Sequence, residues 1–343
     1  MLAAIGKEAE YRKNYLSENI ASIYFGGGTP SLLTIHDLRF TIEKLKKLFI
    51  VDDDAEITLE ANPDDITEQK LIEWKTIGIN RLSIGIQSFN DVDLQWMNRA
   101  HTAQHAINCL QLATKYFKNI TIDLIYGTPT LTDEQWKKNV DLAVSFNVQH
   151  ISCYALTVEA KTALDKLIVQ QKKENVDADK QAKHFELLMQ WMKDAGYEHY
   201  EISNFAKPGY RSKHNSSYWK GLPYLGLGPS AHSYNGTSRQ WNIANNALYI
   251  KSIEQGELNF EKEELTAAQQ LNEYIMTGLR TIEGINFLDK KWLSINGETK
   301  NKIILSAKKW EATGNIFLDE NFLRLTDKGK FLADGIAADL FQL

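Results

Sequence analysis

Residues 21–30 read Ala-Ser-Ile-Tyr-Phe-Gly-Gly-Gly-Thr-Pro, so a short apolar run passes directly into three glycines. This order is typical of a β-strand that ends in a loop, and a ligand can approach the loop backbone closely because glycine has no Cβ. Pro30 then fixes φ and withholds a backbone donor, which gives the loop a defined shape. We therefore expect a strand that ends at a binding loop for a small polar ligand.

The alternation of strand and helix continues through the first half of the chain. Thr67 and Thr132 each stand where a helix N-cap is expected, and Gly78 follows the first of these helices as a C-cap. Parallel strands joined by right-handed helical crossovers predict an α/β fold with a full or partial (β/α) barrel, whose site lies at the carboxyl ends of the strands. The expected strands are Ile20–Phe25, Glu56–Glu60, Arg81–Ile86, Ile120–Tyr126 and His150–Leu156.

The pattern changes after residue 160. Residues 161–194 read as highly charged helix, and residues 204–242 are rich in glycine and aromatic side chains. Loops of that composition usually bind or cover a ligand.

The C-terminal end reads as helices followed by a small hairpin, at Ile316–Leu318 and Phe322–Leu325, which predicts a winged-helix-like domain. No basic recognition face for DNA accompanies it. The chain then divides into a barrel segment, a capping segment and a winged-helix-like segment, at residues 1–160, 161–260 and 261–343.

Composition and charge exclude several classes of protein. The 343 residues include 39 Lys and Arg against 44 Asp and Glu, a net charge of −5 that leaves no electrostatic footprint for nucleic acid. The apolar runs are too short to span a bilayer. We expect a cytoplasmic protein that binds no nucleic acid and is not integral to a membrane.

The two cysteines, Cys109 and Cys153, fall in a predicted helix and a predicted strand. Two cysteines are too few for a disulfide framework and are wrongly spaced for a metal knuckle. They also cannot supply three thiolates to an iron–sulfur cluster. We expect two buried structural thiols.

Four polar residues stand where ligand contacts are expected. Glu60 ends a strand, where a carboxylate often holds ribose hydroxyls, although it can also bond to neighbouring loop amides. Gln87 ends the next strand, and the planar fork of Arg99 suits a ligand carboxylate, although a lone arginine is more often a surface charge. Asp123 lies within an apolar strand and must be paired or hydrogen-bonded, through a ligand or through the protein.

Taken together, the sequence resembles radical S-adenosylmethionine proteins of the oxygen-independent coproporphyrinogen III oxidase group. The segments occur in the order and spacing of that family and extend over nearly the whole chain. They are Tyr24–Leu33, Glu60–Pro63, Ser83–Phe89, Asn98–His101, Ile122–Pro129, Tyr200–Ala206, His214–Trp219 and Gly226–Tyr234.

The resemblance implies that S-adenosylmethionine is a cofactor of the barrel segment. Amide edges, an arginine fork and carboxylates suit a zwitterion that carries a ribose. The residues implied to hold it are Gly27, Gly28, Thr29, Glu60, Gln87, Arg99, Asp123 and Ala155.

Within the family, the chain is most similar to the HemW-type heme chaperone branch, which shares the pattern His-Asn-x-x-Tyr-Trp at residues 214–219. The resemblance implies that the capping segment binds heme or a porphyrin, and that heme passes to an acceptor protein that the sequence does not identify. His214 is a candidate axial ligand, since imidazole binds heme iron. The alternative for His214 is a hydrogen-bonded loop histidine, and His232 competes for the ligand role.

The chain departs from the family at its start. Family members begin with a strand and a CxxxCxxC loop that holds a [4Fe–4S] cluster, and these residues do not include that stretch. Residues 8–19 read as the helix that follows it. We expect a truncated start, a missing first barrel strand and an exposed sheet edge at Ile20–Phe25.

Two alternatives to the heme chaperone function stay open at this point. The first is an oxygen-independent coproporphyrinogen III oxidase, in which a 5′-deoxyadenosyl radical initiates decarboxylation of the substrate's propionates. The second is a cluster-less scaffold that keeps the fold and only binds a partner.

Overall fold

The computed structural model describes residues 1–342 and divides the chain into two compact units. The barrel unit comprises residues 23–35 and 56–212. The composite unit comprises residues 1–22, 36–55 and 213–342. The boundaries of the three segments expected from the sequence stay a prediction.

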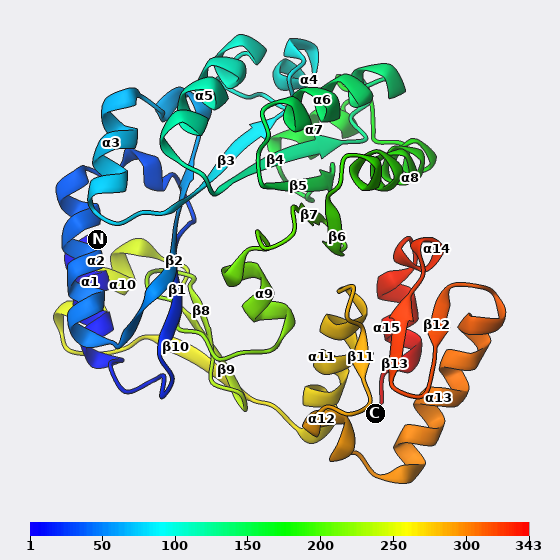
Figure 1. Cartoon of the computed structure of the whole chain (residues 1–343). Coiled ribbons are helices and arrows are strands. Elements are labelled where there is room, and N and C mark those ends of the chain that lie inside the picture. Colours follow the sequence, from blue (N-terminus) through cyan, green and yellow to red (C-terminus); the bar gives the residue numbers. More distant parts are fainter. Residues whose placement is uncertain (343) are drawn as a thin grey trace. The chain divides into compact units, whose positions relative to one another are not determined.

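A seven-stranded sheet organises the first two-thirds of the chain (Figure 1). Strands β2, β3, β4 and β5 run parallel to one another, β7 is antiparallel to β5, and β6 is antiparallel to β7. The curled sheet confirms the predicted partial (β/α) barrel. In sheet order the strands are β1 (Ile20–Phe25), β2 (Val51–Ala61), β3 (Arg81–Gln87), β4 (Ile120–Tyr126), β5 (His150–Ala155), β7 (Asn204–Ala206) and β6 (Glu198–Glu201).

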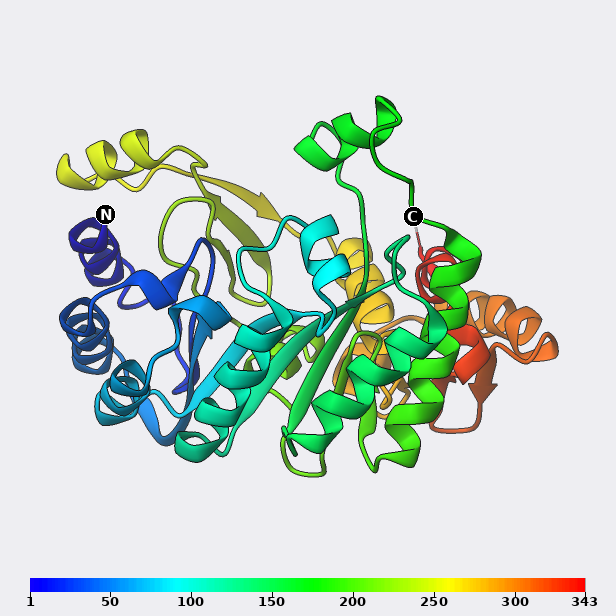
Figure 2. The same cartoon turned by 90° about the horizontal axis from the view of Figure 1, so that it is seen from above.

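Helices of the barrel unit cover the outer face of the sheet (Figure 2). Their starts follow the sequence signals, because the hydroxyls of Thr67 and Thr132 accept hydrogen bonds from backbone N–H groups in the first turn. Gly78 follows α3 with φ +97°, a conformation that favours glycine. These helices are α3 (Glu68–Thr76), α5 (Ala103–Tyr116), α6 (Asp133–Ser145) and α8 (Ala178–Asp194).

The central strands form the core of the barrel unit. In β3 and β4, Leu82, Ile84, Ile122 and Leu124 are fully buried. Strands of a parallel sheet covered by helices are buried on both faces, so they read as almost continuous apolar runs rather than as alternation. A polar side chain in these strands is therefore an exception that needs a partner.

Two boundaries differ from the sequence-based expectation. The first helix, α1, spans Leu2–Tyr11 and ends well before residue 19. Asn14 and Ser17 lie in the stretch beyond it, and such side chains compete for backbone hydrogen bonds and favour turns. Strand β2 begins at Val51, five residues early, because pairing within the sheet overrides the low strand propensity of its aspartates.

The composite unit contains two small antiparallel sheets. One has the order β10-β9-β8, and the other has the order β11-β13-β12. The hairpin strands β12 (Ile316–Leu318) and β13 (Phe322–Leu325) have the predicted bounds. The remaining strands are β8 (His232–Tyr234), β9 (Ser238–Asn242), β10 (Phe260–Glu264) and β11 (Ile285–Asn286).

Helices α11 (Ala267–Leu279), α13 (Gly297–Ala312) and α15 (Ala333–Leu340) pack with the second sheet around a core that includes Ile275 and Leu323. This helical C-terminal part agrees with the helices expected from the sequence. A short helix, α12, covers Lys290–Leu293. Between residues 1 and 342, no helix is both long enough and apolar enough to cross a bilayer.

Candidate functional site

The polar residues at the carboxyl ends of β1 to β4 surround a pocket of about 180 Å³ in the barrel unit. Its walls come from the glycine loop, the ends of three strands and the turn before α5. The residues that line it are Gly28, Thr29, Pro30, Glu60, Ala61, Asn62, Ser83, Gly85, Gln87, Arg99 and Asp123. Six of the eight residues expected to hold S-adenosylmethionine therefore lie in one place.

The glycine loop is tied to Glu60. Gly27 donates its backbone N–H to Glu60 Oε2 at 3.2 Å, and the Tyr24 hydroxyl donates to Glu60 Oε1 at 2.7 Å. A Cβ on Gly26 would lie 2.6 Å from the Tyr24 ring and 3.0 Å from Glu60 Oε1, so only glycine fits there. Gly27 itself does not line the pocket, but it fixes the carboxylate that does.

Gly27 and Gly28 have φ values of +76° and +64°. Side chains with a Cβ rarely adopt this left-handed region. Apart from the glycine itself and its two neighbours in the chain, no described residue has an atom within 4 Å of a Cβ built at either position. Backbone shape explains these two glycines, and it leaves the amide of Gly28 open to a ligand, whereas the Gly27 amide is bonded to Glu60.

Arg99 lies in the turn between α4 (Asp91–Trp96) and α5. Its Nη2 donates to Asn62 Oδ1 at 3.0 Å, and its buried Nε has no hydrogen-bond partner in residues 1–342. Residues 98–101 form a turn, because Asn98 has φ +57° and Thr102 caps a new helix. The turn leaves a donor of Arg99 available to a ligand.

Gln87 and Arg99 flank Gly85. A Cβ on Gly85 would lie 2.9 Å from Gln87 Nε2 and 3.5 Å from Arg99 Nη2. Gln87 has φ +65° and follows a shift in the pairing of β3 with β4. Strain at a non-glycine residue is often kept where it aims a side chain at a site.

Asp123 of β4 is the pocket group whose ionisation is most perturbed. Burial raises the pKa of its carboxyl to about 7, the negative charge of Glu60 acts in the same direction, and a hydrogen bond from Ser152 opposes them. The positive charges of Arg81 and Arg99 also favour the ionised form. A cationic ligand beside Asp123 would stabilise the carboxylate further.

Several pocket residues were not selected from the sequence. Asn62 lies in the same tetrapeptide as Glu60, and Ser83 and Gly85 precede Gln87 at intervals of two. Residues at that interval face the same side of a strand, so this signal was available. Tyr24 gave no comparable signal, because its hydroxyl is placed by a contact with the neighbouring strand.

Two expected site residues lie elsewhere. Ala155 ends β5, pairs with Tyr126 and does not line the pocket. His214 belongs to the composite unit, in α9 (Lys213–Trp219), where its ring packs edge-on against Tyr218 with centroids 5.0 Å apart. His232, its competitor, begins β8 and stacks on Trp241 at 6.2 Å.

Tyr218 also contacts Tyr224, with ring centroids 4.7 Å apart. Burial raises the pKa of Tyr218 to about 12, so its hydroxyl stays protonated at neutral pH. Tyr224 in turn packs against Tyr234. His214 therefore stands at the end of a row of aromatic rings.

Cys109 and Cys153 are both buried, which confirms the expectation of structural thiols. Burial raises the pKa of Cys109 to about 12. Over the part of the chain that the structure describes, no three His, Cys, Asp or Glu residues are grouped as metal ligands.

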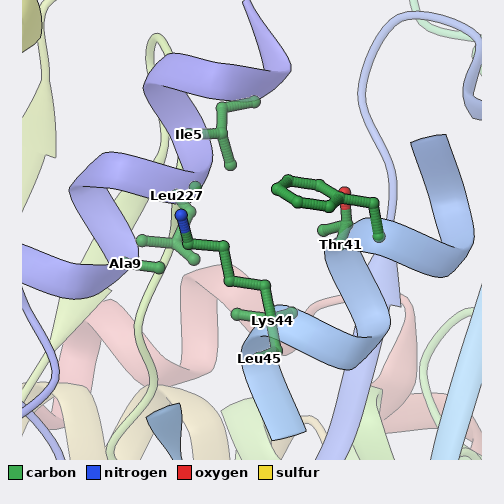
Figure 3. Close-up of a pocket in the computed structure, with 8 residues that line it drawn as sticks. Ile5, Ala9, Thr41, Lys44, Leu45 and Leu227 are labelled. Atoms are coloured by element: carbon green, nitrogen blue, oxygen red, sulfur yellow. The ribbon is translucent and has the colours of Figure 1, made fainter. Parts of the chain in front are cut away.

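A second hollow lies in the composite unit between α1 and α2 (Ile35–Leu48) (Figure 3). Its lining is almost wholly carbon and its volume is about 10 Å³, roughly the space of one water molecule. The aliphatic part of Lys44 crosses it, and Lys44 Nζ pairs with Glu10 at 2.9 Å. This hollow is a packing defect rather than a ligand site.

Comparison with known proteins gives concordant results. Residues 3–143 match the model of the Radical SAM superfamily. The chain is 33% identical to the heme chaperone HemW of Bacillus subtilis over 324 residues, which cover 93% of this chain and 84% of that protein. It is 31% identical to the heme chaperone HemW of Mycobacterium tuberculosis, over 94% of this chain and 80% of that protein.

Among solved structures, the chain is similar to coproporphyrinogen III oxidase (HemN) of Escherichia coli, which is described as a radical SAM enzyme. The TM-score is 0.85 with 20% sequence identity, over 99% of this chain and 82% of the other. At that identity the likeness establishes the fold.

Proposed function

This chain belongs to the HemW family of heme chaperones in the radical SAM superfamily, and from that premise we propose that it binds heme and delivers it to an acceptor protein. The observation that carries the proposal is the similarity to heme chaperones over 93% of the chain, including the helix that contains His214. The acceptor is not identified.

His214 is the residue that we assign to the heme iron. An imidazole nitrogen is a common axial ligand of heme, and aromatic rings pack against the macrocycle. Tyr218 lies one helical turn after His214 and is 40% exposed, so its ring is available for that contact. His232, the competing candidate, is exposed and stacks on Trp241.

We assign the barrel pocket to S-adenosylmethionine. The unpartnered Nε of Arg99 supports this assignment, because a buried donor calls for an acceptor such as the methionyl carboxylate. Glu60 and Asp123 suit ribose hydroxyls and positive charge, with Gln87 beside Arg99. The amides of Gly28 and Thr29 suit polar groups of the ligand, the Gly27 amide holds the Glu60 carboxylate in place, and Ala155 adds an apolar contact at the end of β5.

When bound beside a [4Fe–4S] cluster, S-adenosylmethionine supplies an organic radical after one-electron reduction. Such a cluster is held by cysteine thiolates. The chain has two cysteines, both buried and in different elements, so these residues do not fit the cluster. The role of the pocket residues in this chain is to bind and orient the cofactor.

The experiment that tests the proposal is a hemin titration followed by the Soret absorption. We expect saturable binding by the wild-type chain, a loss of at least about tenfold in affinity for His214→Ala, and little change for His232→Ala. Equal affinity of wild type and His214→Ala for hemin would show that His214 is not the ligand of the heme iron. The absence of saturable binding by the wild type would remove the heme function itself.

A second candidate function is coproporphyrinogen III oxidation, because the fold matches the Escherichia coli oxidase with a TM-score of 0.85. An anaerobic assay with coproporphyrinogen III, S-adenosylmethionine, an iron–sulfur source and a reductant separates the two. Formation of protoporphyrinogen would favour the oxidase. Because the two buried cysteines do not fit a [4Fe–4S] cluster, the absence of the product alone does not decide, and stoichiometric heme binding favours the chaperone.

A further inference from the structure

Two cationic side chains from the C-terminal part of the chain lie against the end of α9. Arg280 follows α11, and its guanidinium carbon is 5.6 Å from the centroid of the Trp219 ring. Lys291 lies in α12, and a Cβ built on Gly221 would be 2.8 Å from its Nζ. All four residues belong to the composite unit.

The existing contacts of Arg280 and Lys291 leave donor groups that can bind a further anion. Arg280 pairs through Nη1 with Asp334, which is 80% exposed, while its buried Nε lacks a hydrogen-bond partner among the described residues. Lys291 is exposed, and its Nζ lies 5.8 Å from the Tyr274 ring. The carboxylate two residues before it, Asp289, uses Oδ1 to accept from the backbone N–H of Lys291.

Their place at the end of α9 fits an elongated anionic ligand bound at His214. At 1.5 Å per residue, the five positions from His214 to Trp219, the last residue of α9, correspond to about 7.5 Å along the helix axis. A tetrapyrrole has its iron at the centre and two propionates on one edge, so iron and carboxylates are separated by a similar span. Tyr218, one turn after His214, lies between the two ends.

A cation is needed at this end of α9 if a carboxylate binds there. The last carbonyl groups of a helix carry partial negative charge and repel an anion. Arginine offers a planar pair of donors to a carboxylate, and lysine supplies a point charge. Without them, a propionate would lose hydration and gain no compensating charge.

We propose that Arg280 and Lys291 bind the propionate carboxylates of a heme whose iron is held at His214. The inference rests on the proposed heme function and adds to it a binding site for the anionic edge of the ligand. A purely structural role is the alternative, since Arg280 contacts both Trp219 and Asp334.

The test compares hemin with hemin dimethyl ester, in which both carboxylates are neutral. Wild type, Arg280→Gln, Lys291→Gln and the control Lys290→Gln are titrated with both compounds and followed at the Soret band. Lys290 is the exposed neighbour on the same helix, so its variant has the same change in net charge. One charge-assisted hydrogen bond corresponds to about a tenfold change in affinity.

We expect wild type and Lys290→Gln to prefer hemin over its ester by at least about tenfold. We expect Arg280→Gln and Lys291→Gln to lose most of that preference, and to keep the Soret position that His214 gives. A thermal unfolding scan accompanies each variant. If Arg280→Gln is destabilised, the proposal is judged on Lys291→Gln, because the Lys291 side chain is exposed and its replacement should not affect folding.

The proposal is overturned if wild type binds hemin and its ester equally, or if both variants keep the wild-type preference. Either result leaves the proposed heme function standing, because hemin still binds. If wild type bound neither compound, the heme function would fail and this proposal would fail with it.

Discussion

Replacing Asp123 with asparagine changes the pH dependence of folding stability. The pKa of this carboxyl is about 7 in the folded protein, against 3.8 for an ordinary aspartate. The folded state therefore holds a proton that the unfolded state releases at lower pH. The contribution of Asp123 to stability is most favourable below about pH 4, and it is lost as the pH rises to about 7.

The size of the effect follows from the shift. Between pH 5 and pH 7, the raised pKa of Asp123 lowers the folding stability over about two pH units, which corresponds to roughly 2–3 kcal/mol at 1.36 kcal/mol per unit. The partial opening of Asp123 to the pocket makes this an upper value. Asp123→Asn is neutral at every pH and keeps an acceptor for Ser152.

The assay is urea unfolding of wild type and Asp123→Asn at pH 5 and pH 8. We expect the variant to gain stability relative to wild type at pH 8, by up to about 2–3 kcal/mol more than at pH 5. Asp179→Asn, an exposed carboxylate on α8, is the matched control and should show the same difference at both pH values. A difference between wild type and Asp123→Asn that is independent of pH would refute the reasoning.

Three further predictions concern the two units. Glu8→Gln should lower the free energy of chemical unfolding by about 3–5 kcal/mol, because the buried carboxylate accepts hydrogen bonds from Arg12, Gly228, Asn242 and Tyr249. The surface control Glu10→Gln should lower it by less than about 1 kcal/mol, and an equal loss of stability in the two variants would contradict the prediction. Gly28→Ala should lower the free energy of unfolding by about 1 kcal/mol, because position 28 has a left-handed backbone, and should weaken the binding of S-adenosylmethionine measured by calorimetry. An unchanged affinity would show that the glycine loop does not contact this ligand. Cys109 and Cys153 should resist a thiol reagent at pH 8 until urea unfolds the chain, since both are buried with raised pKa values; rapid labelling of the native protein would contradict their burial.

The order of strands and helices was predictable because local signals and burial agree in this fold. Strand β4 has the predicted bounds, since its apolar run is buried on both faces. Thr67 and Thr132 are N-caps as expected, because a hydroxyl at that position satisfies a backbone donor that the helix leaves unpaired. The start of β2 was less predictable, because pairing within the sheet rather than local propensity determines where this strand begins.

The pocket was partly predictable for a similar reason. Glu60 and Asp123 are polar exceptions in apolar strands, so their position alone marked them. The role of Tyr24 depends on a hydrogen bond to the neighbouring strand, and the turn at Asn98 depends on a left-handed backbone. Neither feature has a periodic signal in the sequence.

The coordination of bound heme tests the central claim most directly. Electron paramagnetic resonance of the hemin-loaded chain reports the axial ligand of the iron, and His214→Ala removes the imidazole that we assign to it. We predict an imidazole-ligated spectrum in wild type that is lost in His214→Ala and restored by added imidazole. Identical spectra for wild type and His214→Ala would contradict the account.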